Sequence, residues 1–281
     1  MKLRCRDALV ALDRAALMGV VNVTPDSFSD GGLWFDASAA IARGIDMVVE
    51  GAAFLDVGGE STRPGAAPVS EDEELRRVLP VVEGLRAAVD VPISIDTRKA
   101  GVARRAVSAG ASMVNDTIGE PTDRSLDAVA AESGAAVVVM HSRGTPATMR
   151  ELTQYDDVTH AVAAWLERRI EELVSAGVGA DAIVVDPGFG FAKTPGQNLE
   201  LLRRLDEIVA IGHPVLVGTS RKSFIGAVLD APVDERLEGT AATVAWAVAH
   251  RADIVRVHDV RPMERVVRMT EAIRDPSPEF V

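Results

Sequence analysis

Residues 70–97 read SEDEELRRVLPVVEGLRAAVDVPISIDT, and this stretch decides the fold. It opens with Ser70 and a run of acidic residues, which helix N-termini prefer, and its apolar residues then recur at helical spacing. It closes with the short apolar run VPISIDT (91–97), which is typical of a buried strand. Another run of this kind, AFLDVGG (53–59), stands before it. Residues 53–97 therefore predict a strand, a helix and a second strand.

The same pattern repeats along the chain. Short apolar runs, separated by polar turns and amphipathic helical stretches, occupy residues 17–23, 53–59, 91–97, 112–117, 135–142, 182–188, 214–220 and 253–259. Continuous apolar strands that alternate with helices indicate a parallel sheet covered by helices. Eight such units in roughly 250 residues match the size of a (β/α)8 TIM barrel, which is the fold we predict. A doubly wound open sheet is the alternative, but the glycine-rich nucleotide turn expected after its first strand is not found here.

The domain organisation follows from this count of units. We predict a single domain over residues 1–281, with residues 1–15 as an N-terminal cap before the barrel. The connection from residue 223 to residue 252 is longer than the others and predicts two helices. The chain contains no Pro/Gly/Ser-rich linker and no low-complexity tract that would mark a domain boundary.

Composition and charge exclude several classes of function. The net charge is −12, from 30 Lys+Arg against 42 Asp+Glu, so the surface repels nucleic acid and anionic membranes. No stretch approaches the roughly 18 apolar residues of a membrane span, and the N-terminus lacks the apolar block of a signal peptide. Together with the single cysteine, Cys5, this leads us to expect a cytoplasmic protein. An anionic ligand would need positive charge gathered in one site.

Polar side chains end almost every predicted strand. The active site of a barrel lies at the C-terminal ends of its strands. In this sequence those ends read Asn22, Asp56, Asp96, Asn115, His141, Asp186, Lys222 shortly after the seventh strand, and Arg256 with His258. A single aspartate after a strand is most often a helix cap or a turn residue, but eight polar ends together predict a site.

The side chains of this ring fall into two chemical types. Asp96, Asn115 and Asp186 supply hydrogen-bond acceptors, which fit a ligand rich in N–H groups, such as the edge of a pterin or a guanine. Arg63, Lys222, Arg256 and His258 supply donors for phosphate or carboxylate. The alternative is that these cations pair with the aspartates in a structural network. No HExxH, CxxC or zinc-type spacing is present, whereas a hard cation held mostly by ligand phosphates remains compatible.

Seven motifs carry a resemblance to a known family. They read NVTPDSFSDGG (22–32), DVGGESTRPGA (56–66), SIDT (94–97), VNDT (114–117), DPGFGFAKT (186–194), GTSRKSF (218–224) and RVHDV (256–260). In this order and spacing the chain resembles the dihydropteroate synthases, and the resemblance runs from about residue 16 to residue 274. These are folate-pathway transferases and sulfonamide targets. They condense 6-hydroxymethyl-7,8-dihydropterin diphosphate with 4-aminobenzoate to 7,8-dihydropteroate and diphosphate, by an SN1-like substitution. The family forms homodimers through its barrel helices.

The resemblance implies roles for particular residues. It suggests Asp96, Asn115, Asp186 and Lys222 as pterin ligands, with Met140 and Phe191 packed nearby, and Asn22 as a ligand of Mg²⁺. The residues implied to bind substrate are Phe28, Thr62, Arg63, Pro64, Asp96, Asn115, Met140, Asp186, Phe191, Gly218, Lys222, Ser223, Arg256 and His258. Those expected to be catalytic are Asp30, Arg63, Lys222, Arg256 and His258. Asp56 is expected to act behind these residues.

The loop that follows the first barrel strand, TPDSFSDGG (24–32), is longer than an ordinary strand-to-helix connection. We expect it to close over the site, carrying Phe28 and Asp30, with Gly31 and Gly32 as hinges. A plain surface turn is the alternative.

Two other functions share much of this pattern. A non-catalytic pterin-binding paralogue would keep the fold but usually loses parts of the loops or strand ends. A methyltetrahydrofolate-dependent methyltransferase would also read a pterin, but it has no need for STRPGA or SRKSF. The expected partners are therefore small-molecule substrates, Mg²⁺ and a second copy of the chain, without nucleic acid or membrane.

Overall fold

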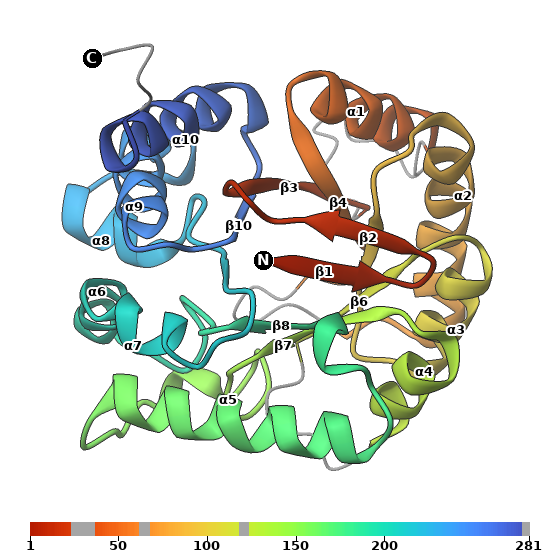
Figure 1. Ribbon diagram of the computed structural model, residues 1–281, viewed down its shortest axis with the longest axis horizontal. Coiled ribbons are helices and arrows are strands. Elements are labelled where there is room, and N and C mark those ends of the chain that lie inside the picture. Colours follow the sequence, from red (N-terminus) through yellow and green to blue (C-terminus); the bar gives the residue numbers. More distant parts are fainter. Residues whose placement is uncertain (24–36, 62–67, 118–123, 277–281) are drawn as a thin grey trace.

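Eight parallel strands form a nearly closed barrel in the computed structural model, which describes residues 1–23, 37–61, 68–117 and 124–276 (Figure 1). The strands run in the order β8-β7-β6-β5-β4-β3-β10-β9. A parallel bridge between Val185 and Val215 brings the two outermost strands together. The barrel strands are β3 (Ala16–Asn22), β4 (Ala52–Gly58), β5 (Ile93–Asp96), β6 (Met113–Asp116), β7 (Ala136–Met140), β8 (Ile183–Asp186), β9 (Leu216–Val217) and β10 (Ile254–Val257). The predicted (β/α)8 barrel is thus confirmed, and each predicted apolar run overlaps one strand.

Helices surround this sheet (Figure 1). They are α1 (Ala37–Val49), α2 (Glu71–Ala88), α3 (Ala100–Ser108), α4 (Ser125–Ser133), α5 (Val158–Ser175), α6 (Pro195–Arg203), α7 (Leu205–Val209), α8 (Ser223–Leu229), α9 (Leu237–Ala249) and α10 (Val260–Arg274). Among the described residues, short 3-10 turns η2 (Met149–Glu151), η3 (Ala180–Ala182) and η4 (Val233–Glu235) lie in the connections. The long connection after β9 does contain two helices, α8 and α9, as the sequence predicts.

The start of α2 illustrates how the sequence sets these boundaries. The Ser70 hydroxyl accepts a hydrogen bond from the backbone N–H of Glu73, and acidic residues fill the first turn. Both features satisfy the positive N-terminus of a helix. Buried residues, among them Val78, Val81 and Leu85, then form the face that packs against the sheet. The helix therefore begins and packs as the motif SEDEELRRVLPVV predicts.

The first residues form a hairpin of β1 (Lys2–Cys5) and β2 (Ala8–Ala11). In Figure 1 this hairpin crosses the end of the barrel that faces the viewer. Leu3, Cys5 and Leu12 share a buried cluster with residues from the beginnings of the barrel strands, such as Met113 and Ile254. The hairpin therefore seals the N-terminal end of the barrel, opposite the end where active sites of this fold lie.

The alternation of side chains along each strand carries polar residues to the other end. The buried cluster that the barrel shares with the hairpin contains side chains that point into the barrel, namely Met18, Phe54, Met113, Val184 and Ile254. Side chains two residues further along a strand point to the same side. Asp56, Asn115, Asp186 and Arg256 therefore lie inside the C-terminal end of the barrel.

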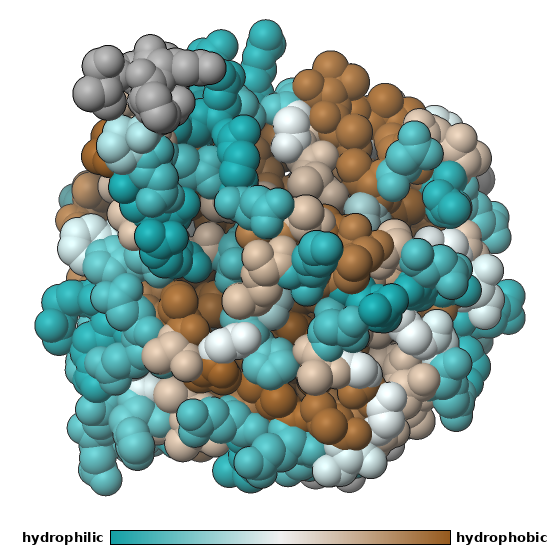
Figure 2. All heavy atoms as spheres, viewed as in Figure 1, coloured by the Kyte–Doolittle hydropathy of each residue, from teal (hydrophilic) through white to brown (hydrophobic). Residues whose placement is uncertain are grey.

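The outer surface agrees with the composition. Seen from the hairpin side, hydrophilic side chains cover much of the molecule, with smaller hydrophobic areas between them (Figure 2). Within the described residues, no helix combines the length and apolar character needed to cross a bilayer.

Candidate active site

Strand pairing brings the predicted polar residues to one rim. Asn22 pairs in register with Gly58, Gly58 with Asp96, and Asp96 with Asn115. On the other side Met140 pairs with Asp186. The six consecutive strands β3 to β8, together with β10, which pairs with β3, thus have their C-terminal ends at the same end of the barrel.

Not every predicted strand end is the last residue of its strand. Asp56 lies two residues before the end of β4, and Asn115 and Arg256 each lie one residue before the end of their strands. Asp96, Met140 and Asp186 are terminal residues. The interpretation of Asp56 as a strand end is therefore wrong. Asp56 is fully buried below the rim, because β4 continues for two further residues.

Arg256 links the acidic residues at this end of the barrel through hydrogen bonds. Its Nε donates to Asp56 Oδ2 at 2.6 Å, and its NH2 group donates to Asp96 Oδ2 at 2.9 Å. Asp56 Oδ2 also accepts from Asn115 Nδ2 at 3.0 Å. Burial disfavours the charge on Arg256, but the two carboxylates outweigh it and raise its pKa. Pairing between the cation set and the aspartates, which the sequence left open, is therefore real for Arg256.

One cation shared by two carboxylates leaves Asp96 only partly compensated. Burial and the neighbouring Asp56 carboxylate raise the pKa of Asp96 to about 7, against the opposing attraction of Arg256. Its second oxygen accepts only a long hydrogen bond, 3.4 Å, from Thr117 Oγ1. Asp96 is therefore placed to gain from a ligand that donates further N–H groups.

Two more acceptors on this rim are buried without a partner among the described residues. They are Asn115 Oδ1 and Asp56 Oδ1. Buried acceptors normally have a hydrogen-bond donor, and one without a donor costs about 1–3 kcal/mol. Orphaned acceptors beside Asp96 are what a site for an N–H-rich heterocycle would have before the ligand binds.

Asp186 ends β8 across the barrel from these groups. Its Oδ1 accepts from the backbone N–H of Gly188 at 2.7 Å. Burial raises the pKa of Asp186, whereas this hydrogen bond and the charge of Lys222 act in the opposite direction. Asp186 thus provides a third carboxylate on the same rim.

His258 lies just after β10 and next to the loop that follows β9. Its Nδ1 is 3.0 Å from Ser220 Oγ, and its backbone N–H donates to the same oxygen at 3.2 Å. Because that oxygen already accepts the backbone N–H, its own hydrogen is well placed to bond Nδ1, which leaves Nε2–H as a donor. Burial and the charge of Arg256 lower the pKa of His258 to about 3, so the imidazole is neutral at pH 7.

Lys222 and Phe191 face each other at the edge of the site. The ammonium of Lys222 lies 4.2 Å from the centre of the Phe191 ring, a cation–π arrangement. Lys222 precedes α8, Phe191 belongs to the loop after β8, and both are half-buried. Ser223, the first residue of α8, is exposed, and Gly218 directly follows β9.

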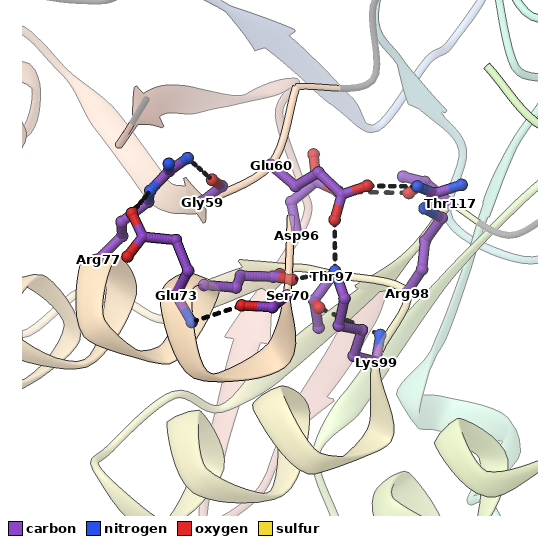
Figure 3. A network of polar contacts seen from close by, with 11 residues as sticks. Gly59, Glu60, Ser70, Glu73, Arg77, Asp96, Thr97, Arg98, Lys99 and Thr117 are labelled. Carbon is purple, nitrogen blue, oxygen red and sulfur yellow. Dashed lines mark hydrogen bonds and ion pairs between the residues drawn. The ribbon is translucent and has the colours of Figure 1, made fainter. Parts of the chain in front are cut away.

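A polar network borders the rim next to β4 and β5 (Figure 3). Glu60 accepts hydrogen bonds from both Arg98 and Lys99, and Lys99 also donates to the buried Glu74 at 2.6 Å. Burial opposes ionisation of Glu60, but the bonds from Lys99 and Arg98 hold its pKa below the ordinary value. The chain leading to residue 61 is therefore tied to the end of β5. No local sequence signal predicts this network, because its members come from helix α2 and from two separate connections, those after β4 and after β5.

Sequence reasoning also missed Lys193. This buried lysine donates to the backbone oxygens of Gly188 and Phe191, and its Nζ lies 3.0 Å from Nδ1 of the buried His141. Burial lowers the pKa of Lys193 to about 7, against the attraction of Asp186, and burial together with Lys193 lowers the pKa of His141 well below its usual value. The only sequence signal was a lysine directly after the stretch GFGFA (188–192), which contains two glycines.

Five of the predicted site residues lie outside the described part of the chain. These are Phe28, Asp30, Thr62, Arg63 and Pro64. The described residues that the fold brings together are Asn22, Asp96, Asn115, Met140, Asp186, Phe191, Gly218, Lys222, Ser223, Arg256 and His258.

The side chains near Asn22 determine whether the site could hold the expected magnesium ion. Among the described residues no group of three or more His, Cys, Asp or Glu side chains could hold a metal by itself. Asn22 offers one amide oxygen at the end of β3. One amide oxygen from the protein fits a hard cation that takes most of its oxygen ligands from a bound phosphate and from water.

Comparison with known proteins agrees with the fold. Residues 18–258 match the family described as "Pterin binding enzyme". A dihydropteroate synthase of Synechocystis is 48% identical over 92% of this chain and 90% of its own length. Solved dihydropteroate synthases of Xanthomonas albilineans, with 4-aminobenzoic acid, and of Yersinia pestis, with a sulfonamide drug complex, superpose with TM-scores of 0.91 and 0.92. Each is 41% identical and matches 98% of this chain and 99% of the other.

A parallel barrel whose rim offers buried acceptors beside an arginine is the architecture of a pterin-binding enzyme. The chain belongs to this family and, within it, to the dihydropteroate synthases, which confirms the enzyme class predicted from its motifs.

Proposed function

We propose that this chain condenses 6-hydroxymethyl-7,8-dihydropterin diphosphate with 4-aminobenzoate, giving 7,8-dihydropteroate and diphosphate. The observation that carries the proposal is the rim on which Asp96, Asn115 and Asp186 gather around Arg256 in a chain of this family. Sulfonamides resemble 4-aminobenzoate in shape, so they compete with it for the same pocket.

The hydrogen-bond acceptors of the rim bind the edge of the pterin ring. Asp96 and Asp186 take N–H hydrogens of the ring edge, and Asn115 Oδ1 takes another from the exocyclic amino group. Asp56 stays behind these contacts, where it orients Asn115 and Arg256 through the hydrogen bonds at 3.0 and 2.6 Å. Met140 packs against the ring from the end of β7.

The donors hold the diphosphate. Arg256 and the neutral His258, through Nε2–H, donate hydrogen bonds to its oxygens. The Lys222 ammonium adds a third donor. Thr62 and Arg63 complete this set from outside the described residues. Removing one well-placed donor from such a site typically costs about 3 kcal/mol, or roughly 100-fold in rate.

The substitution is SN1-like. The C–O bond to diphosphate breaks first, and the electron pair leaves with the diphosphate. The remaining carbocation is delocalised into the dihydropterin. The Asp96 and Asp186 carboxylates lie on this rim near Arg256 and Lys222, and in their ionised form they favour the cationic pterin.

The nucleophile arrives from the side of Phe191. The ring of Phe191, the Lys222 side chain and Ser223 form the described part of the 4-aminobenzoate pocket, which Phe28 and Pro64 complete. The amine attacks the cation and then loses its proton, so no strong base is needed. Asp30 acts in the loop that excludes water while the cation exists.

Magnesium fits this scheme as a partner of the diphosphate. Asn22 would hold it through one amide oxygen, and the bound ion would neutralise charge on the leaving group.

A second copy of the chain fits the surface of the last helices. Trp246 on α9 and Met269 and Ile273 on α10 expose large apolar side chains, and α9 and α10 pack against each other. Met269 and Ile273 are four residues apart and share one helix face. We expect a homodimer by light scattering, and Ile273→Lys should shift it toward monomer. A cytoplasmic location, which suits the single buried Cys5, is testable by cell fractionation.

A non-catalytic pterin-binding protein is the remaining alternative, because it would need the same acceptors. Turnover separates the two. Formation of dihydropteroate and diphosphate, one of each per 4-aminobenzoate consumed, supports the synthase, whereas pterin binding without turnover supports the alternative.

A further inference from the structure

The loop between β8 and α6, residues 187–194, follows an unusual path. Gly188, Gly190 and Ala192 adopt left-handed φ angles of 71°, 81° and 46°. At Gly188 an added Cβ would lie 1.9 Å from the backbone oxygen of His141, so only glycine permits this close approach to β7. Such a backbone keeps its course only where its surroundings hold it.

The side chain of Lys193 holds it. Its Nζ lies 2.9 Å from Gly188 O, 3.1 Å from Phe191 O and 3.0 Å from His141 Nδ1. In its protonated form the lysine has three N–H donors and no acceptor, so these three partners use all of them. Lys193 is 8% exposed and His141 1% exposed, and water therefore has little access to take over these bonds.

His141 gives this clamp a fixed anchor. Burial lowers the pKa of His141, so the ring is neutral, and facing the protonated Lys193 its Nδ1 accepts while its hydrogen sits on Nε2. The backbone N–H of His141 donates to Asp186 O at 2.9 Å, and its ring meets Trp165 edge-on with centres 5.2 Å apart. Asn198 supports the loop from the other side, accepting the N–H of Gly190 at 2.6 Å.

The clamp sits directly behind the wall proposed for 4-aminobenzoate. One carbonyl that it holds belongs to Phe191, whose ring lies under the Lys222 ammonium. We propose that Lys193, anchored by His141, is a positioning residue that fixes the Phe191 ring against Lys222 and so shapes the pocket for the aromatic amine. The identity of that ligand rests on the proposed function, but the clamp itself does not.

Lys193→Met tests the proposal, because it keeps an unbranched side chain out to the Cε position and removes all three donors. We expect the KM for 4-aminobenzoate to rise about tenfold or more, while the Kd of the pterin changes less than about threefold. His141→Leu should act in the same direction. His141→Asn should restore most of the loss, because its Oδ1 can take the place of Nδ1 as an acceptor.

The control for general loss of stability is Arg169→Met. Arg169 is also a buried cation, bonded to Asp127 at 2.9 Å in a cluster that includes none of the proposed substrate residues. We expect it to lower Tm without changing the KM for 4-aminobenzoate. If Arg169→Met raised this KM as much as Lys193→Met, or if His141→Leu and His141→Asn behaved alike, the positioning role would be refuted.

A second readout works without turnover. The chain contains 7 phenylalanines, which can be labelled with 4-fluorophenylalanine, and Phe191→Leu identifies the ¹⁹F signal of Phe191. Lys193→Met should shift or broaden that signal, and Arg169→Met should not. If the chain made no dihydropteroate, the proposed function would fail while this signal still tested the clamp. An unchanged Phe191 signal in Lys193→Met would overturn the clamp whatever the activity.

Discussion

Replacing Asp96 by asparagine tests how the rim recognises the pterin. The carboxylate accepts from Arg256 at 2.9 Å and from Thr117 at 3.4 Å, and it stands beside the orphaned acceptors of Asp56 and Asn115. Asparagine keeps the shape but removes the charge, and it turns one acceptor into an NH2 donor. Hydrogen bonds to charged groups contribute about 1.5–3 kcal/mol. A loss of about 2 kcal/mol raises the Kd of the pterin about 30-fold.

The assay is calorimetry with 6-hydroxymethyl-7,8-dihydropterin, which lacks the diphosphate and isolates this side of the site. Thr117→Val is the matched control, because it removes only the long, neutral hydrogen bond to Asp96, and its Kd should change less than about threefold. An Asp96→Asn protein with a Kd within about threefold of the unchanged chain would remove Asp96 from pterin recognition.

The pH dependence gives a second check on the same residue. Because the pKa of Asp96 is raised to about 7, its carboxylate is ionised above this pH and protonated below it. The ionised form accepts the N–H groups of the ligand, so affinity should rise between pH 6 and pH 8 and fall as the pH drops. In Asp96→Asn this dependence should be flat. A variant that kept the slope of the unchanged chain would assign it to another group.

Three further perturbations test the rest of the site. Phe28→Ala should raise the KM for 4-aminobenzoate far more than it weakens pterin binding, and equal effects in steady-state kinetics and calorimetry would count against the proposed loop pocket. Lys222→Met removes the ammonium above Phe191, so kcat/KM should fall about 100-fold, whereas a fall below about tenfold would exclude a catalytic role. EDTA should abolish turnover until Mg²⁺ is added back, yet leave binding of the diphosphate-free pterin unchanged; turnover that persists in EDTA would contradict the metal requirement.

The barrel could be predicted because its signal is local. Each strand is a continuous apolar run, such as AAVVVMHS, and the start of α2 follows from Ser70 and the acidic residues after it. The fold then places the ends of parallel strands together, which is why Asp96, Asn115, Asp186 and Arg256 could be grouped before any coordinates.

The remaining features depend on the path of the chain in space. Nothing local distinguishes Asp56, buried below the rim, from a strand end, although β4 continues for two residues beyond it. Lys193 meets His141 only because the loop after β8 takes three left-handed steps and passes against β7. Arg256 likewise bonds Asp56 and Asp96, which lie 200 and 160 positions before it in the chain. The periodicity of the sequence carries no information about such distant pairs.

The most direct test of the central claim is to follow dihydropteroate and diphosphate together, from 6-hydroxymethyl-7,8-dihydropterin diphosphate and Mg²⁺, with and without 4-aminobenzoate. A dihydropteroate synthase should release one diphosphate for each dihydropteroate formed, and formation of dihydropteroate should depend on 4-aminobenzoate. Tight binding of the pterin with no dihydropteroate formed, under conditions where a known dihydropteroate synthase turns over, would contradict the account and leave a protein that binds pterins without transforming them.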